Sequence, residues 1–307
     1  MALFGIPYMG SKSAIAIDII KKLPSGNRFV DLFGGGFSMT HCAMLSGKYN
    51  TVYYNEYNHL IPPLIEKAIN GEYNYNVFKP EFITREKFNE LKDKDGYVKY
   101  IWSFSNKGTN YLFSKEIEQG KKALHNFVVF GTKDDFIKTN MNDIDKYITP
   151  NITDIQKRRL LLKKYFRLKF NKRCDLQQLE RLQQLERLQR LQQLEQLERL
   201  ELNCGSYEEY IHQDGDVVYC DPPYEGTADY NEKVFNFKKF YDWVDTRPYP
   251  VYFSSYNNIS DKRFSMVWAC GKVSLMGGAS NVKKYECLYC NKVALMYKEE
   301  NYNDRKS

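Results

Sequence analysis

The sequence predicts an α/β fold whose core is a parallel sheet. The first observation is the order of patterns near the N-terminus, strand, glycine turn, helix, strand and acid, which is how a parallel α/β sheet opens. The second is that strand-like patterns return only after residue 214. The third is a composition of 43% hydrophobic and 27% charged residues over 307 residues, which is typical of one large or two modest globular domains.

The N-terminal part of the chain alternates helical and strand patterns. The spacing of its apolar residues predicts five elements, in this order: helix 11–23, strand 28–33, helix 37–45, strand 51–54 and helix 58–70. The first strand runs directly into Gly34, Gly35 and Gly36, and the second is followed by Glu56. Both loops follow the carboxyl ends of strands, where open α/β sheets bind ligands.

The remainder of the chain divides by composition. Residues 72–170 hold many Lys, Asn, Tyr and Phe and only short helical patterns, so they form a module of their own. Ser206 and Glu209 make a capping-box pair for a short helix. Three later strands are predicted at 215–220, 249–254 and 285–297. We therefore expect three parts: one domain from 1–71 and 203–307, a module over 72–174, and a leucine repeat over 175–202.

The repeat has a leucine at every third position from Leu176 to Leu200. Each three-residue step turns an α-helix by about 300°, so the leucines wrap the helix instead of forming one stripe, and a heptad coiled coil is excluded. Composition favours an α-helix, whereas spacing favours a narrow triangular solenoid; both stay open. The repeat contains four Arg and six acidic residues, so its net charge is negative and it is not the polyanion-binding surface. We expect it to be a spacer or a self-association element.

Charge and cysteine usage narrow the function classes. The net charge of +7 favours a polyanionic partner. No apolar run reaches the roughly 18–20 residues of a membrane span, and the N-terminus lacks a signal-peptide pattern, so we expect a cytosolic protein. The seven cysteines are then free thiols. Cys287 and Cys290 form a lone CxxC without a histidine nearby, which predicts buried thiols in a strand and no metal site.

The glycine turn and Glu56 predict a nucleoside cofactor. Met39 stands where a dinucleotide fingerprint would have its third glycine, which argues against a pyrophosphate. Glu56, twenty residues past Gly36, is placed to accept hydrogen bonds from ribose hydroxyls. S-adenosylmethionine satisfies both observations. The alternative is a plain turn beside a surface acid.

The sharpest motif is Asp221-Pro222-Pro223-Tyr224, directly after a predicted strand. Two prolines cannot continue a strand ladder, so the chain leaves the sheet rigidly. Such a loop can hold a planar amine, because Asp221 and a proline carbonyl accept its two hydrogens while Tyr224 stacks on the ring. These contacts would aim the nitrogen lone pair at an electrophilic methyl group. The alternative is a proline-rich exit turn.

These motifs together resemble the Dam-like DNA adenine-N6 methyltransferases, particularly their phage and mobile-element relatives. Residues 7–12 are similar to the first cofactor motif of the family, with Ser11 in place of a glycine, and Glu56 stands where most members have Asp. The other matching segments are 29–38, 55–58, 221–224, 253–257 and 286–291.

The resemblance implies a Rossmann-like S-adenosylmethionine-dependent methyltransferase sheet with an inserted, mainly helical DNA-recognition domain. The implied reaction is site-specific methylation at N6 of a flipped adenine in double-stranded DNA, with Asp221, Pro222, Pro223 and Tyr224 as catalytic residues. Lys12 and the glycines would lie at the methionine end of the cofactor. The implied cofactor-binding residues are Tyr8, Gly10, Lys12, Asp31, Phe33, Gly34, Gly35, Gly36, Glu56 and Asp221.

In this interpretation the segment from about residue 72 to 170 reads the target. Its basic and aromatic residues would supply phosphate contacts and wedges for base extrusion. Those expected to contact DNA are Lys99, Trp102, Lys107, Tyr111 and Lys115. For each of them the alternative is a packed or solvated side chain.

Two other functions remain open at this point. An RNA amino-group methyltransferase could use the same loop, because the loop holds any planar exocyclic amine; methyl transfer to duplex DNA and to ribosomal RNA would separate the two. A catalytically idle DNA-binding or assembly protein could instead act through the repeat, and absence of cofactor binding would favour it.

Overall fold

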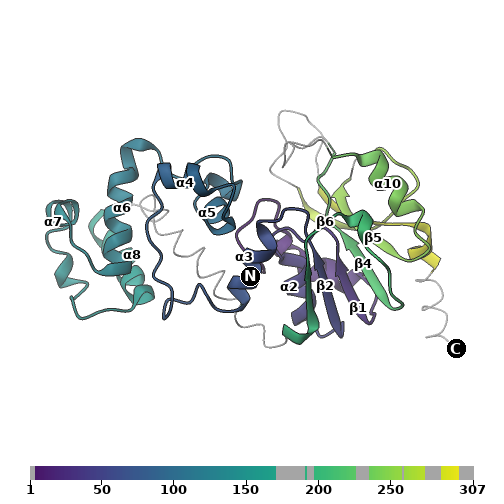
Figure 1. Ribbon diagram of the computed structural model, residues 1–307, viewed down its shortest axis with the longest axis horizontal. Helices are drawn as coiled ribbons and strands as arrows, with labels where there is room; N and C mark the ends of the chain where they lie inside the picture. Colours follow the sequence, from purple (N-terminus) through teal and green to yellow (C-terminus); the bar gives the residue numbers. More distant parts are fainter. Residues whose placement is uncertain are drawn as a thin grey trace. The chain divides into compact units, whose positions relative to one another are not determined.

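The computed structural model describes residues 4–170, 191, 197–225, 235–257, 259–273 and 285–296, and the chain forms two compact units (Figure 1). The sheet unit comprises residues 1–5, 10–62 and 194–307, and the helical unit comprises residues 6–9 and 63–193. Most of the predicted leucine repeat over 175–202 lies outside the described residues. No described helix is both long enough and apolar enough to cross a membrane.

Seven described strands form one sheet in the order β3-β2-β1-β4-β5-β7-β6. The strands are β1 (Arg28–Asp31), β2 (Thr51–Asn55), β3 (Leu200–Asn203), β4 (Asp216–Cys220), β5 (Val251–Tyr256), β6 (Ser265–Val273) and β7 (Tyr285–Cys290). The pairs among the first five are parallel, and β7 runs antiparallel to β5 and β6. The strand order reverses between β1 and β4, and such a switch point opens a crevice at the carboxyl ends of the strands.

Helices cover both faces of this sheet. Helix α10 (Phe237–Asp245) packs Phe240 and Val244 against a cluster that includes Val218 and Phe253. Helices α1 (Ala16–Lys22) and α2 (Ser38–Leu45) pack together, with α2 against β1 and β2. Every residue of β1 and β4 is buried, and burying one large apolar side chain stabilises a fold by about 1.5–3 kcal/mol. The central strands are therefore the most firmly held part of the unit.

The other described helices of the two units are short or belong to the helical unit. Near the sheet lie η1 (Lys12–Ala14), η5 (Leu197–Arg199) and η6 (Tyr207–Glu209), and α3 (Ile61–Ile69) begins where the helical unit takes over. The helical unit holds α4 (Arg85–Leu91), α5 (Gly96–Ile101), η2 (Phe104–Asn106), α6 (Lys115–Phe130), α7 (Asp135–Asn140), η3 (Ile144–Lys146) and α8 (Ile155–Phe170). Part of this unit has its own core, in which Phe127, Ile137 and Leu162 join α6, α7 and α8.

The last predicted strand is shorter than expected. The strand β7 ends at Cys290, and residues 292–296 are helical instead of extending a strand to 297. Asn291 causes the change, because its Oδ1 accepts a hydrogen bond from the Ala294 amide at 3.1 Å, as a helix N-cap does. Its Nδ2 donates to the carbonyls of Val244 and Tyr249. Cys287 and Cys290 are buried in β7 as free thiols, as predicted.

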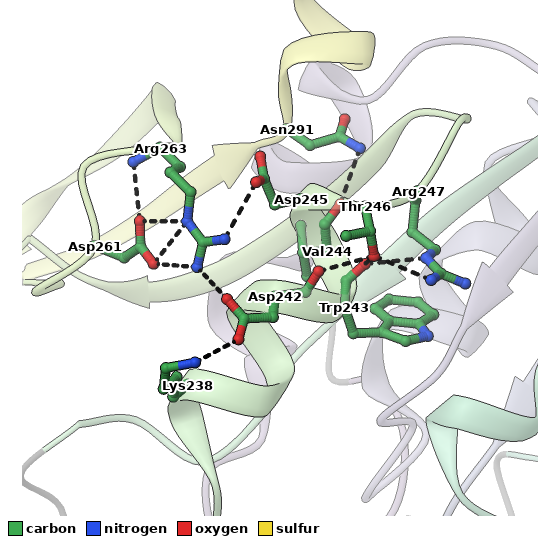
Figure 2. Close-up of polar contacts among 10 residues, drawn as sticks. All are labelled: Lys238, Asp242, Trp243, Val244, Asp245, Thr246, Arg247, Asp261, Arg263 and Asn291. Carbon is green, nitrogen blue, oxygen red and sulfur yellow. Dashed lines mark hydrogen bonds and ion pairs between the residues drawn. The ribbon is translucent and has the colours of Figure 1, made fainter.

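An arginine joins the end of α10 to the loop before β6. Figure 2 shows the guanidinium of Arg263 among three carboxylates, with Asp242 at 2.9 Å, Asp245 at 3.1 Å and Asp261 at 2.6 Å. In the same loop, Ser260 donates from its amide and hydroxyl to the carboxylate of Glu225, at 3.2 and 2.9 Å. Because Glu225 follows Tyr224 directly, this network holds the chain that leaves the predicted catalytic loop.

Candidate active site

Three loops singled out in the sequence lie at the carboxyl edge of the sheet, and two of them flank its switch point. Gly34, Gly35 and Gly36 follow β1, and Asp221 is the first residue after β4, which pairs directly with β1. Glu56 follows β2, the neighbour of β1 on the other side. Carboxyl ends of adjacent parallel strands form one edge, so the sheet alone brings these groups together.

The glycine turn is held by hydrogen bonds from β2. The Gly34 amide donates to the Asn55 carbonyl at 2.9 Å, the Gly35 amide donates to Glu56 Oε2 at 2.8 Å, and the Tyr54 hydroxyl donates to the Gly35 carbonyl at 2.8 Å. Gly35 has a φ of +43°, a conformation that favours glycine. A side chain at position 34 would place its Cβ 2.1 Å from the ring of Tyr54. The turn therefore needs glycine because of packing as well as backbone conformation.

Replacing Gly34 by alanine should lower the free energy of unfolding by about 3 kcal/mol, because overpacking a rigid core site forces ring and backbone to shift. The matched control is Gly47→Ala, whose Cβ would meet nothing within 4 Å although its φ is +66°; it should cost about 1 kcal/mol. Urea denaturation of both variants measures the difference. Equal losses would contradict the packing argument.

Glu56 is half-buried and keeps acceptor capacity. Its Oε1 accepts the Asn58 amide at 2.8 Å, and its Oε2 accepts the Gly35 amide. Burial raises the pKa of Glu56, and the backbone donors oppose this. The backbone amide of Tyr57 also contributes to this opposition. A carboxylate offers about four lone-pair positions, so Glu56 can still accept a further hydrogen bond.

Asp31, the last residue of β1, is a buried acid with one unsatisfied oxygen. The Thr40 hydroxyl donates to its Oδ2 at 2.8 Å, whereas its Oδ1 has no hydrogen-bond partner among the described residues. Burial raises the pKa of Asp31 to about 7, with the charges of Asp221 and Glu56 contributing and the Thr40 hydroxyl opposing. A buried orphan acceptor is costly and marks a place for a ligand donor.

Asp221 belongs to a cluster of charges that includes a residue outside the predicted set. Its Oδ2 lies 2.8 Å from Lys12 Nζ, which is also 3.6 Å from Glu286 Oε2 at the start of β7. Burial raises the pKa of Asp221 to about 6; Lys12 opposes the rise and Glu286 adds to it. Buried acids with perturbed pKa values beside a specific charged partner are typical of catalytic sites.

Tyr224 is buried against the same groups. Its hydroxyl lies 3.2 Å from Asp221 Oδ1 and 3.2 Å from Glu286 Oε2. The Tyr256 ring packs edge-on at 4.7 Å between centroids, and Lys12 Nζ lies 4.8 Å from the centroid of the Tyr224 ring. The Tyr224 ring is therefore held by a T-shaped contact with Tyr256 and has a cation over it.

The remaining predicted residues are two catalytic prolines and three cofactor-binding residues. Pro222 is buried and Pro223 half-buried in the loop. The Gly10 carbonyl accepts Lys12 Nζ at 3.3 Å, and Phe33 stacks on Tyr207 at 5.1 Å. Tyr8 belongs to the helical unit, where its ring lies 5.3 Å from that of Tyr100. Among the residues that the structure describes, no cluster of His, Cys, Asp and Glu could hold a metal ion.

Two of the predicted DNA-contacting residues pack inside the helical unit. Trp102 is 2% exposed and contacts Phe82, and Tyr111 is 8% exposed, with its hydroxyl donating to the Ile83 carbonyl. Lys107 and Lys115 are exposed, and Lys99 is half-exposed and paired with an aspartate. In the same turn the sequence interpretation passed over Phe104, which is 61% exposed. Trp102 and Tyr111 are therefore core residues of the helical unit, whereas the ring of Phe104 is exposed to solvent.

The strand order, in which β7 is antiparallel, is consistent with a methyltransferase fold. The glycine turn and the acidic loop at the switch point are also consistent with this fold. The family model of the D12 class N6 adenine-specific DNA methyltransferases matches residues 8–247. Since this is most of the chain, the protein belongs to that family and is an adenine-specific DNA methyltransferase, as the resemblance implied. A search of the curated proteins found no match.

Proposed function

We propose that the sheet unit transfers a methyl group from S-adenosylmethionine to N6 of an adenine flipped out of double-stranded DNA, and that the helical unit contacts the DNA. The observation that carries the proposal is the position of Asp221 and Tyr224 beside the glycine turn, at the switch point between β1 and β4. Family membership supports the reaction and the substrate.

The residues around the glycine turn fit the cofactor. Asp31 offers a buried acceptor without a partner among the described residues, which suits an ammonium donor, and Glu56 keeps a lone pair for a ribose hydroxyl. The three glycines leave backbone open at the strand end. When bound, S-adenosylmethionine supplies an electrophilic methyl group.

The catalytic loop would act by positioning and electrostatics. The carboxylate of Asp221 and the carbonyl of Pro222 accept the two hydrogens of the adenine amino group, and Tyr224 stacks on the base. Accepting both hydrogens raises the electron density on N6 and stabilises the positive charge that develops there. Flipping an adenine costs a few kcal/mol, and stacking on Tyr224 recovers part of that cost.

The surface of α8 supports a role of the helical unit in DNA binding. This helix has seven Lys and Arg and no acidic residue. Lys157, Lys164 and Arg167 are exposed, and their spacing places them on one helix face. Arg158 is buried instead, where it donates to the Val128 carbonyl at 2.8 Å near the end of α6. Within the part of the chain that the structure describes, these three exposed side chains form no ion pair, and we propose that they contact phosphates.

Replacing Lys164 and Arg167 together by glutamine should weaken DNA binding for all sequences and reduce the slope of log affinity against log salt by about 2, since each lost phosphate contact lowers it by about 1. Titration of a fluorescent duplex at several salt concentrations measures the slope. The control is Lys138→Gln on α7, an exposed lysine already paired with Asp135 at 3.6 Å. An unchanged slope in the double variant would place the DNA elsewhere.

The experiment that tests the proposal is transfer of labelled methyl from S-adenosylmethionine to a long mixed-sequence duplex, followed by digestion to nucleosides. We expect N6-methyladenine. Labelling of ribosomal RNA but not DNA would contradict the DNA substrate, and absence of cofactor binding would contradict the cofactor. Self-association through residues 175–202 is a separate proposal, which sedimentation of the full chain tests.

A further inference from the structure

Lys12 contacts the two groups that a flipped adenine would need. It forms a 2.8 Å ion pair with Asp221, and it lies 4.8 Å from the centre of the Tyr224 ring. The proposed function requires Asp221 to accept a hydrogen from the adenine amino group and Tyr224 to offer a ring face to the base. Lys12 therefore competes with the adenine for both groups, and we expect it to shift when the adenine enters.

The Tyr224 hydroxyl competes for Asp221 in the same way. It lies 3.2 Å from Asp221 Oδ1, so both oxygens of the catalytic carboxylate have a donor nearby. A carboxylate whose charge is already neutralised by an ammonium group stabilises a new positive charge less well. The reaction is helped if both donors shift to another acceptor.

One residue faces both donors. Glu286 Oε2 lies 3.2 Å from the Tyr224 hydroxyl and 3.6 Å from Lys12 Nζ. A small movement of either donor would exchange Asp221 for Glu286 without leaving a buried charge unpaired. An unpaired buried charge is strongly destabilising. A second carboxylate at this place therefore lowers the free-energy cost of the exchange.

Resting on the proposed function, we infer that Glu286 is a positioning residue that takes over Lys12 and the Tyr224 hydroxyl when the adenine binds, which frees Asp221 for the amino group. Glu286 is suited to this because it lies within a strand, paired in register with Tyr256 of β5. Its side chain is only 28% exposed. It lies beyond residue 247, where the family match ends, in the segment 286–291 that resembles a later family segment.

The test is Glu286→Gln, which keeps the shape and removes the charge. We expect kcat to fall about 10- to 100-fold, as for a reacting group held slightly out of place. KM for DNA should stay within about threefold, because phosphate contacts supply most of the affinity. Binding of S-adenosylmethionine, measured by calorimetry, should also stay within about threefold, and the denaturation midpoint should not change. The matched control is Glu208→Gln, an exposed carboxylate paired with Lys239, which should behave as wild type.

The pH profile separates positioning from a merely structural role. Asp221 must be ionised to accept the amino group, so activity falls at low pH as it is protonated. Its pKa is raised to about 6 by burial and, among its neighbours, by Glu286, while Lys12 and Tyr224 lower it; Asp31 and Tyr219 also face it. Removing the Glu286 charge should therefore move the acid limb of kcat/KM, which reports the free enzyme, to lower pH although the plateau falls.

A double-mutant cycle with Tyr224→Phe gives an independent readout. If Glu286 acts through the Tyr224 hydroxyl and Lys12, the two single variants and the double variant should not be independent. The product of the two single-variant fold losses in kcat should exceed the fold loss of the double variant. Wild-type kcat in E286Q, loss of cofactor binding, loss of the fold, or an unmoved acid limb would each overturn the inference. If the wild-type enzyme itself makes no N6-methyladenine, the proposed function fails instead.

Discussion

Replacing Asp221 by alanine is expected to lower methyl transfer at least about a thousandfold, which corresponds to about 4 kcal/mol of lost transition-state stabilisation. The carboxylate is the group placed to accept from the reacting amino nitrogen and to offset its developing charge. Labelled transfer to duplex DNA under single-turnover conditions measures the loss. The variant should still fold, because Glu286 remains 3.6 Å from Lys12 and keeps that buried ammonium compensated.

Binding of S-adenosylmethionine should be largely retained in Asp221→Ala, because Gly34, Asp31 and Glu56 are untouched. The matched control is Asp214→Ala, which removes an exposed carboxylate just before β4 and should leave turnover unchanged. Normal turnover in Asp221→Ala would refute the chemistry assigned to the loop. Lost cofactor binding would move Asp221 from the adenine to the cofactor.

The sequence could predict this edge of the sheet because the information is local. A strand that runs into glycines, a strand followed by an acid, and a strand followed by two prolines each place their loop at a carboxyl end. Parallel pairing of β1 with β2 and β4 then brings Gly35, Glu56 and Asp221 to one edge. Glu286 could not be found in this way. It stands at the start of a strand, and only the antiparallel direction of β7 brings it to the same edge.

The strands β3 and β6 were not predicted, because their sequences show little alternation of apolar and polar residues. The strand β3 is four residues long, none fully buried, and lies at the end of the leucine repeat, whose spacing of three hides an alternating pattern. The strand β6 lies at the other edge of the sheet and has register shifts against β7. The predicted helix over 11–23 is in fact a 3₁₀ turn followed by α1, because Ile15, with a φ of −124°, is not helical and its amide donates to the Lys12 carbonyl.

The helical unit illustrates a different limit. Trp102 and Tyr111 were expected at the DNA because aromatic residues among lysines are typical of nucleic-acid surfaces. In the structure the same residue types build a core around Phe88 and His125. Composition identifies which side chains a module contains, but burial depends on contacts between segments far apart in the chain.

Replacing Asp216 by alanine is expected to have the largest effect on stability, about 3–5 kcal/mol, because it removes the buried partner of the Arg28 guanidinium. It leaves Arg28 only the more distant and more exposed carboxylate of Glu201, at 3.6 Å. The side chains of Asp216 and Arg28 are 1% and 10% exposed, and Arg28 donates to both oxygens of Asp216 at 2.8 Å. The Tyr210 hydroxyl and the Gln213 amide also donate to Asp216. Urea denaturation measures the loss. The control is the double variant Arg28→Met with Asp216→Leu, which removes both charges and should recover most of the stability.

The pH dependence of stability provides the second readout for Asp216. Burial alone raises its pKa, but the donors Arg28, Tyr210 and the Gln213 amide reverse this, so the folded pKa lies below the usual value. A lowered folded pKa stabilises the fold above the unfolded pKa of about 3.9 and loses that contribution as pH falls through the folded value. Wild type should therefore lose more stability in acid than Asp216→Ala. Arg28 and Asp216 begin β1 and β4, at the edge opposite Asp221, so turnover per folded molecule should not change; reduced turnover would show that this edge also shapes the active site.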